Sequence, residues 1–178
     1  MRDARVSLGR GDQALSYRLS ATRRSDDGLR GLFDSRELNQ LRLRLDAAPN
    51  PRDEIQLDAG VSDLAAGDGY AGDVGNPART LQWRDWHVHG VWRRQLSDTE
   101  QLKLSLSATR ESLRDRYDYE PVPGIVVDFS GVGRRLDAEL QHQRSLSPEL
   151  RLVWGVGLRH EAAQSRPLYY RDNALSFR

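Results

Sequence analysis

Residues 101–109 read QLKLSLSAT, and this stretch decides the fold. Leu102, Leu104, Leu106 and Ala108 alternate with polar residues at every second position. Successive side chains of a β-strand point to opposite faces, so this stretch forms a strand with one apolar and one polar face. A helix would scatter both sets around its surface. The period of two therefore predicts a strand.

The same alternation recurs along the chain and predicts an all-β fold. It is found at residues 5–10, 15–22, 40–47, 55–62, 135–141 and 150–159, and residues 175–178 have the pattern of a strand that is just beginning. Residues 81–94 add a further, less regular strand. We therefore expect one domain, residues 1–178, that forms an antiparallel up-and-down meander of about 8–9 strands.

Residues 81–94 alternate less regularly than the other segments. Apolar residues fall at Leu81 and Trp83 first, and then at Trp86, Val88 and Trp92. A bulge or a strand end near Arg84 and Asp85 would produce this change of phase.

The connections between the predicted strands alternate strictly between short and long. The short ones are residues 11–13, 48–53, 96–99 and 145–149; the long ones are 25–35, 63–79, 112–128 and 164–173. Transmembrane barrels have short periplasmic turns and long extracellular loops, whereas a soluble sandwich has little reason to alternate in this way. The loop lengths therefore favour a barrel in the bacterial cell outer membrane.

The polar faces of the strands are too charged for a dry core. Arg42, Arg44, Asp58, Lys103 and Asp137 are examples, and burying such charges costs a large desolvation free energy. A wet lumen, or a surface that packs against a plug, accommodates them. The turn at Pro49–Pro51 is expected to pair Ala47 with Ile55, which sets Arg44 opposite Asp58.

Composition excludes several other classes of protein. The net charge is +1, which removes the electrostatic basis for binding nucleic acid, and the chain has no cysteine for disulfides or thiolate metal sites. The chain contains no run of about 18 apolar residues, so no membrane helix is predicted. No apolar leader follows Met1, so we expect the chain to be a piece of an exported protein.

The aromatic residues near the predicted strand ends suit the interfacial girdles of a membrane barrel. Packing within the loops is the competing interpretation. The residues concerned are Tyr17, Trp83, Trp92, Tyr117, Tyr119 and Phe129.

Residues 15–28, LSYRLSATRRSDDG, resemble an early barrel hairpin of the TonB-dependent outer-membrane receptors. Residues 41–60, a strand, a Pro-Asn-Pro turn and a returning strand, are similar to the next hairpin of that family, and residues 92–97 resemble a further one. The resemblance covers most of the chain and lies in the general pattern of strands and turns, without an invariant motif. The family's plug domain, TonB box and C-terminal closing strands have no counterpart here, so the resemblance implies part of a receptor barrel.

The resemblance also implies a function and partners. The implied function is the import of a ferric siderophore or a similar scarce nutrient. The implied partners are outer-membrane lipid, the plug domain and remaining barrel strands, and the TonB–ExbB–ExbD system. Long loops with arginines suit an anionic iron chelate. The aromatic loop residues that could contribute are Tyr70, Tyr117, Tyr119, Tyr169 and Tyr170, although no motif identifies a ligand-binding residue.

No enzymatic, cofactor or metal site is expected. His87 and His89 share a strand face but have no evident third ligand, so a polar pair is favoured over a metal site. His142 and His160 are interpreted as isolated residues of the polar face or of strand ends. The Gly-rich residues 67–73 lack the features of a phosphate or calcium loop and predict a surface loop.

Two alternatives compete with the partial receptor. One is a complete small barrel of eight strands with a structural or adhesive role, which could close around a filled interior. The other is a soluble β-sheet binding protein. In the receptor reading, Leu102, Leu104 and Leu106 lie on the convex side of one sheet; in a soluble sandwich they pack into a core.

Overall fold

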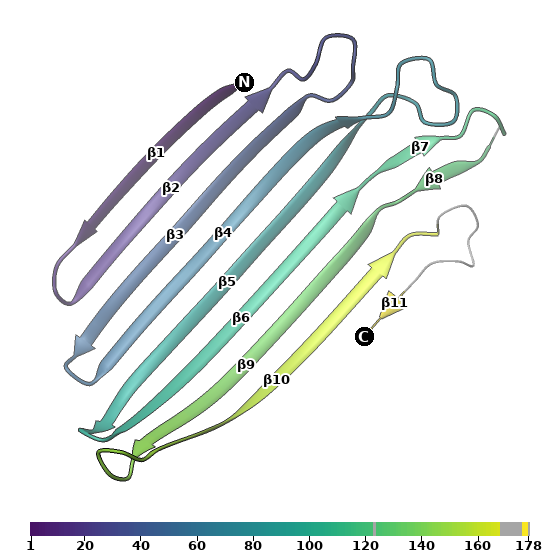
Figure 1. The fold of residues 1–178 in the computed structure, drawn as a ribbon. Helices are drawn as coiled ribbons and strands as arrows, with labels where there is room; N and C mark the ends of the chain where they lie inside the picture. Colours follow the sequence, from purple (N-terminus) through teal and green to yellow (C-terminus); the bar gives the residue numbers. More distant parts are fainter. Residues whose placement is uncertain (123, 168–175, 178) are drawn as a thin grey trace.

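The computed structural model describes residues 1–122, 124–167 and 176–177 of the chain. Strands are the only regular secondary structure among these residues (Figure 1), and most strands of the main sheet are long. The elements are β1 (Arg2–Gly11), β2 (Leu15–Asp26), β3 (Arg36–Asn50), β4 (Asp53–Asp68), β5 (Arg79–Ser97), β6 (Glu100–Arg114), β7 (Arg116–Asp118), β8 (Val126–Asp128), β9 (Gly131–Ser145), β10 (Arg151–Ser165) and β11 (Ser176–Phe177).

The main sheet is an antiparallel meander in which neighbours in sequence are neighbours in space. Its order is β1-β2-β3-β4-β5-β6-β9-β10-β11, which confirms the predicted all-β up-and-down topology. The short β7–β8 hairpin was not predicted and extends the connection between β6 and β9 beyond the sheet (Figure 1). In the described chain β1 pairs only with β2, so the sheet is open at this edge.

The alternation of short and long connections is confirmed across the described residues. Tight turns at residues 12–14, 51–52, 98–99 and 146–150 lie at one end of the sheet, and longer loops at the other (Figure 1). In the first turn the Asp12 carboxylate accepts hydrogen bonds from the backbone N–H groups of Ala14 and Leu15 at 2.8 and 2.9 Å. The loop predicted from residue 63 begins later, because β4 continues to Asp68.

The register predicted for the β3–β4 hairpin is confirmed. Ala47 pairs with Ile55, and Arg44 lies directly opposite Asp58. The ion pair itself is diagonal, however, since Asp58 accepts from Arg42 at 3.3 Å while Arg44 binds Asp46 at 3.0 Å. The register therefore follows the apolar pattern, and the long arginine side chains choose among several nearby carboxylates.

The bulge predicted near Arg84 and Asp85 is wrong. β5 is continuous there, and its pairing with β4 runs without a shift from Asp53↔Arg94 to Asp68↔Arg79. Register shifts in the main sheet occur instead beside two tight turns, at Ala47/Asn50 and Gln95/Ser97. The change of apolar phase within β5 therefore needs a different cause.

The sheet has almost no core. Among the described residues, only Val91 and Val127 are buried hydrophobic side chains, whereas Leu158 is 74% exposed and Val6 is 69% exposed. Globular domains of this length bury about 68–70% of the surface of their unfolded chain. A single open layer with this exposure lacks the second layer that a soluble β-sandwich requires.

Candidate functional site

One face of the sheet carries a continuous apolar band. Cross-strand pairing links Leu43, Ala59, Val88, Ala108 and Leu136 side by side on this face. Alternate residues of each strand extend the band along its length. The apolar band comprises Val6, Leu8, Leu15, Tyr17, Leu19, Ala21, Leu41, Leu43, Leu45, Ala47, Ile55, Leu57, Ala59, Val61, Trp86, Val88, Trp92, Leu102, Leu104, Leu106, Ala108, Leu136, Ala138, Leu140, Leu152, Trp154, Val156 and Leu158.

The apolar band runs obliquely to the strands. Ala21 is its last apolar member toward the long loops in β2, and successive pairs link Ala21 to Trp86 in β5. On β6 and β9 the paired positions are already Arg110 and Arg134. The loop-side edge of the band therefore stays at one register level from β2 to β5 and lies closer to the tight turns on β6, β9 and β10.

The tight turns step in the same direction. Leu15, the first residue of β2, is linked through successive pairs to Ile55, Leu104 and Val156. β10 extends past that level to Arg151. Strands of membrane barrels are tilted by about 35–45°, so any plane parallel to the membrane crosses them obliquely. The band and the line of turns share this slant.

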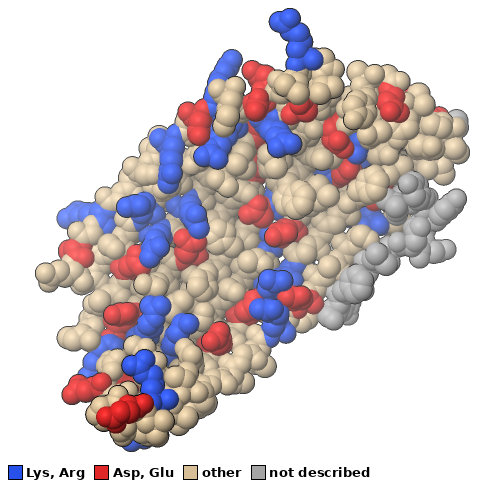
Figure 2. All heavy atoms as spheres, viewed as in Figure 1, with Lys and Arg blue, Asp and Glu red and all other residues tan. Residues whose placement is uncertain are grey.

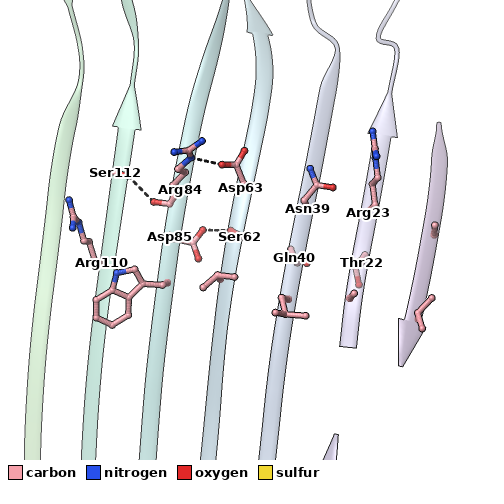
Figure 3. Close-up of a pocket in the computed structure, with 16 residues that line it drawn as sticks. Thr22, Arg23, Asn39, Gln40, Ser62, Asp63, Arg84, Asp85, Arg110 and Ser112 are labelled. Atoms are coloured by element: carbon pink, nitrogen blue, oxygen red, sulfur yellow. Dashed lines mark hydrogen bonds and ion pairs between the residues drawn. The ribbon is translucent and has the colours of Figure 1, made fainter. Parts of the chain in front are cut away.

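Polar residues border the apolar band on its loop side. On the same face these are Arg23, Asn39, Asp63 and Arg84, followed at lower levels by Arg110, Arg134 and His160. Figure 3 views this part of the sheet with the strand colours in the opposite order to Figure 1. It shows Arg84 and Arg110 on adjacent strands of this border, and Arg23 farther along it on β2. Arg84 is ion-paired with Asp63, and Arg23 with Glu37 at 3.0 Å.

Three aromatic residues mark the turn-side part of the band. Tyr17, Trp92 and Trp154 all lie on the apolar face, each at a level successively closer to the tight turns. Trp154 is 54% exposed and Tyr17 is 39% exposed. Amphipathic rings of this kind are enriched where lipid meets water.

On the long-loop side of the band, apolar residues lie on the opposite face of the sheet, which explains the irregular pattern of β5. Trp83 pairs with Leu64 and Leu113, and Leu64 pairs with Leu38. These four residues lie on the face opposite the apolar band, at the level next to Arg84 and Asp63. The pattern therefore changes on several strands at the same level, as expected where the environment outside the sheet changes.

The other face carries ionic and polar contacts between strands. Asp58 accepts from His87 at 2.9 Å and from Arg42, while Arg159 contacts Asp137 at 2.5 Å and Arg135 contacts Glu161 at 2.7 Å. Figure 2 shows basic and acidic residues interspersed over a wide face of the sheet. Most of these groups are well exposed, so each pair contributes about 0–1 kcal/mol and the face suits water.

A buried arginine organises the long-loop end. Arg79 binds both carboxylate oxygens of Asp115, at 2.5 and 3.1 Å, and also Asp68 at 2.9 Å and Asn76 at 2.6 Å. Its guanidinium lies over the Tyr117 ring, 4.4 Å from the centroid. The Arg79 and Asp115 side chains are only 11% and 9% exposed. The hydrogen bonds to Asp115 raise the pKa of Arg79 above its ordinary value.

These contacts tie two loops together. Asp115 lies at the base of the β7–β8 hairpin, where its backbone accepts from Phe129 N at 2.9 Å. Tyr117 Oη donates to Gly75 O at 3.2 Å, which joins the hairpin to the loop between β4 and β5. The sequence has no local signal for this cluster, because residues 79 and 115 lie 36 positions apart, at the open ends of β5 and β6.

The aromatic residues predicted as girdle members separate into two groups. Tyr17 and Trp92 lie on the apolar face near its turn-side edge, and their place in a girdle stays a prediction. Trp83 lies on the opposite face, so its assignment to a lipid-facing girdle is wrong. Tyr117 packs among the loops, and Tyr119 and Phe129 also lie in the β6–β9 connection. The first group is identified by the face on which each residue lies, which alternates along the strand, and not by its nearness to the strand end. The same criterion adds Trp154 to this group.

The histidines form no metal centre in the described part of the chain. His87 contacts Asp58, and His89 contacts Ser105 at 3.2 Å. His142 and His160 are interpreted from the sequence as residues of the polar face or of strand ends. The polar-face assignment is wrong, since both pair in register within the apolar face, and His142 lies three residues before the end of β9. His142 contacts Glu100 at 2.7 Å and the edge of Trp154, with 5.3 Å between the ring centroids.

The loop residues expected to approach a ligand are only partly brought together. Tyr117 and Tyr119 belong to the connection that contains the β7–β8 hairpin, and Tyr70 lies in the neighbouring loop, where it is 60% exposed. Of residues 67–73, predicted as a surface loop, Gly67 and Asp68 end β4 and the rest lie in the loop between β4 and β5, with Gly69 and Gly72 at positive φ. Tyr169 and Tyr170 lie outside the described residues.

Comparisons with known proteins add no relative. No family model, no curated protein and no solved structure matches this chain. Within the described residues, no helix has the length and apolarity needed to cross a membrane.

Proposed function

We propose that this chain is a segment of the wall of an outer-membrane β-barrel, and that the barrel belongs to a receptor of the TonB-dependent class. Such a receptor imports a ferric siderophore or a similar scarce nutrient. The proposal rests on a single sheet with one apolar face, one charged face, tight turns at one end and long loops at the other.

The oblique apolar band carries this proposal. An amphipathic sheet in water has no reason to tilt its apolar region relative to its strands. Lipid imposes such a tilt, because the hydrocarbon layer is a plane and barrel strands cross it at an angle. At the register level where β2 still has the apolar Ala21, β6 already has Arg110. The line of tight turns shifts in the same direction across the sheet, as a lipid-facing band requires.

The charged face then lines the interior of the barrel. Opposite charges there, such as Arg159 with Asp137, remain solvated in a water-filled lumen or against a polar plug. The long loops lie at the outer side, where a receptor captures its ligand. The Arg79 cluster holds two of these loops in a fixed relation, which preorganises any ligand contact that they make.

The open edge favours a large barrel over a complete small one. β1 has an unpaired edge in the described chain and exposes Val6 and Leu8, at 69% and 55%. Lipid cannot satisfy unpaired backbone groups, so a strand at this position needs a neighbour inside a membrane. In the proposal, the remaining strands of the receptor supply that neighbour.

Cell fractionation and uptake together test the proposal. The protein is followed in the organism that makes it, and its gene is deleted. We expect it in the outer-membrane fraction, and we expect the deletion strain to lose growth on at least one ferric chelate under iron limitation. Recovery in a water-soluble fraction overturns the membrane assignment. Outer-membrane recovery with unchanged use of all chelates and other scarce nutrients overturns only the receptor assignment.

A further inference from the structure

Two arginines without an acidic partner lie directly opposite one another at the loop-side border of the apolar band. Arg110 of β6 pairs in register with Arg134 of β9. Both are exposed, and in the described chain neither makes an ion pair. Directly opposed like charges destabilise a sheet pair, so a counter-charge from outside the described residues would stabilise this arrangement.

Among the described residues, the surroundings of the pair offer no free anion. On the same face the adjacent levels hold Ala108, Leu136, Ser112 and Val132, and Trp86 pairs with Arg110. The nearest acid along the border is Asp63, whose carboxylate is already ion-paired with Arg84 (Figure 3). The acids of β5 and β6 near this level, Asp85 and Glu111, lie on the opposite face.

The position of the pair selects the chemistry of its partner. One side of the pair is the apolar band, which faces acyl chains under the proposed function. The other side leads to the loops and to water. A ligand that fits both sides has an apolar body and an anionic head at the boundary between hydrocarbon and water. Guanidinium groups bind phosphate through paired, charge-assisted hydrogen bonds.

We propose that Arg110 and Arg134 form a docking surface for the phosphate of a lipid headgroup in the leaflet on the long-loop side. The lipid lies with its acyl chains against the apolar band and its phosphate between the two guanidinium groups. Ser112, at the adjacent level of β6, lies on the water side, where its hydroxyl donates to the backbone carbonyl of Arg84 at 3.2 Å. This inference rests on the proposed membrane location and adds a lipid class to it.

Fluorescence quenching of Trp86 tests the docking surface. The chain has four tryptophans, so replacing Trp83, Trp92 and Trp154 with Phe leaves Trp86 as the only reporter. The protein that carries this chain, with any tryptophan outside residues 1–178 also replaced by Phe, is reconstituted in phosphatidylcholine vesicles that contain a minor fraction of either brominated phosphatidic acid or brominated phosphatidylcholine. A basic residue near the headgroup layer enriches an anionic lipid roughly fivefold. We expect phosphatidic acid to quench Trp86 as if enriched at least roughly fivefold over phosphatidylcholine.

Matched variants identify the residues responsible. Arg134→Gln, and more strongly Arg110→Gln with Arg134→Gln, is expected to remove the excess quenching by phosphatidic acid. Arg135→Gln makes the same charge change one residue away on the opposite face and should leave the excess intact. Loss of the excess in Arg135→Gln as well, or its persistence in the double variant, overturns the inference.

The same experiment separates this inference from the proposed function. Equal quenching of Trp86 by both brominated lipids contradicts the docking surface but leaves the membrane wall standing. Absence of quenching by either lipid, in protein that remains bound to the vesicles, contradicts the lipid-facing assignment of the band and with it both proposals.

Discussion

Trp92 donates a hydrogen bond of 2.9 Å from its indole Nε1 to the Asp53 carboxylate, across the β4–β5 pair. This bond joins the aromatic residues at the turn-side edge of the apolar band to the adjacent tight turn. Asn50 donates to the other oxygen of Asp53 at 2.7 Å. The Asn50 hydrogen bond contributes most, and Trp92 adds to it, in holding the pKa of Asp53 below its ordinary value.

We predict that the Trp92 contact weakens in acid. A group whose folded pKa is lowered stabilises the folded state fully above its unfolded pKa, about 3.9 for Asp, and this stabilisation is lost as the pH falls through the lower folded value. The indole N–H resonance of Trp92 should therefore shift only below about pH 4. Trp86, which has no such acceptor among its described contacts, serves as the control, and Asp53→Asn should abolish the titration. A Trp92 transition near neutral pH contradicts this account.

Arg79→Leu is predicted to loosen the long-loop end. It leaves the Asp115 carboxylate buried without its partner, and breaking a buried ion pair costs about 3–5 kcal/mol. Limited proteolysis should then cut residues 69–78 and 115–130 much faster than in the unaltered protein. Arg116→Leu, at an exposed position of β7, should change cleavage little. Replacing Arg79 and Asp115 together with Leu should recover part of the protection; if it does not, the ion pair is not what holds the loops.

Gly60 is predicted to be required by its neighbour His87. A Cβ at residue 60 would lie 2.6 Å from His87 Cε1, so Gly60→Ala must displace the ring from Asp58. At Gly133, also in a strand, a Cβ meets nothing within 4 Å. Glycine in a strand interior is less stable than alanine by about 0.5–1 kcal/mol. In urea unfolding from vesicles, Gly133→Ala should be neutral or stabilising and Gly60→Ala destabilising. Equal effects of the two variants would show that His87 moves without cost.

Leu106→Arg is predicted to impair membrane assembly far more than Ser105→Arg. Leu106 lies within the apolar band and is 50% exposed, whereas Ser105 lies on the charged face beside Glu139. An arginine facing lipid near the bilayer midplane costs about 2–4 kcal/mol, while the lumenal face accommodates charge. Folding yield in vesicles measures the difference. Similar yields for both variants would argue that neither face contacts lipid.

Much of the sheet follows from the period-two pattern alone. Because each strand must place its apolar residues on one face, the pairing of Ala47 with Ile55 and of Arg44 with Asp58 could be predicted from the sequence alone. The order of the strands follows from their short connections in the same way. These features are local, and a single sequence contains them.

The features that were missed depend on neighbouring strands. In β5 alone, the change of phase between Trp83 and Trp86 has the same pattern as a bulge; only the aligned strands show Leu64 and Leu113 changing face at the same level. The Arg79–Asp115 pair joins residues 36 positions apart, and the unmatched Arg110–Arg134 pair joins different hairpins. No motif within one segment could have identified them.

The lipid-facing assignment of the apolar band is tested most directly by single-cysteine scanning of β6. The natural chain has no cysteine, so each introduced thiol is the only one present. Ser105, Leu106, Ser107 and Ala108 are replaced one at a time, and each thiol is challenged in vesicles with a water-soluble maleimide. A fluorophore on the same thiol is then exposed to a nitroxide on the lipid chains. We predict rapid maleimide reaction without lipid quenching at 105 and 107, and slow reaction with strong quenching at 106 and 108. Equal behaviour at all four positions, or the reverse alternation, contradicts the membrane-wall account.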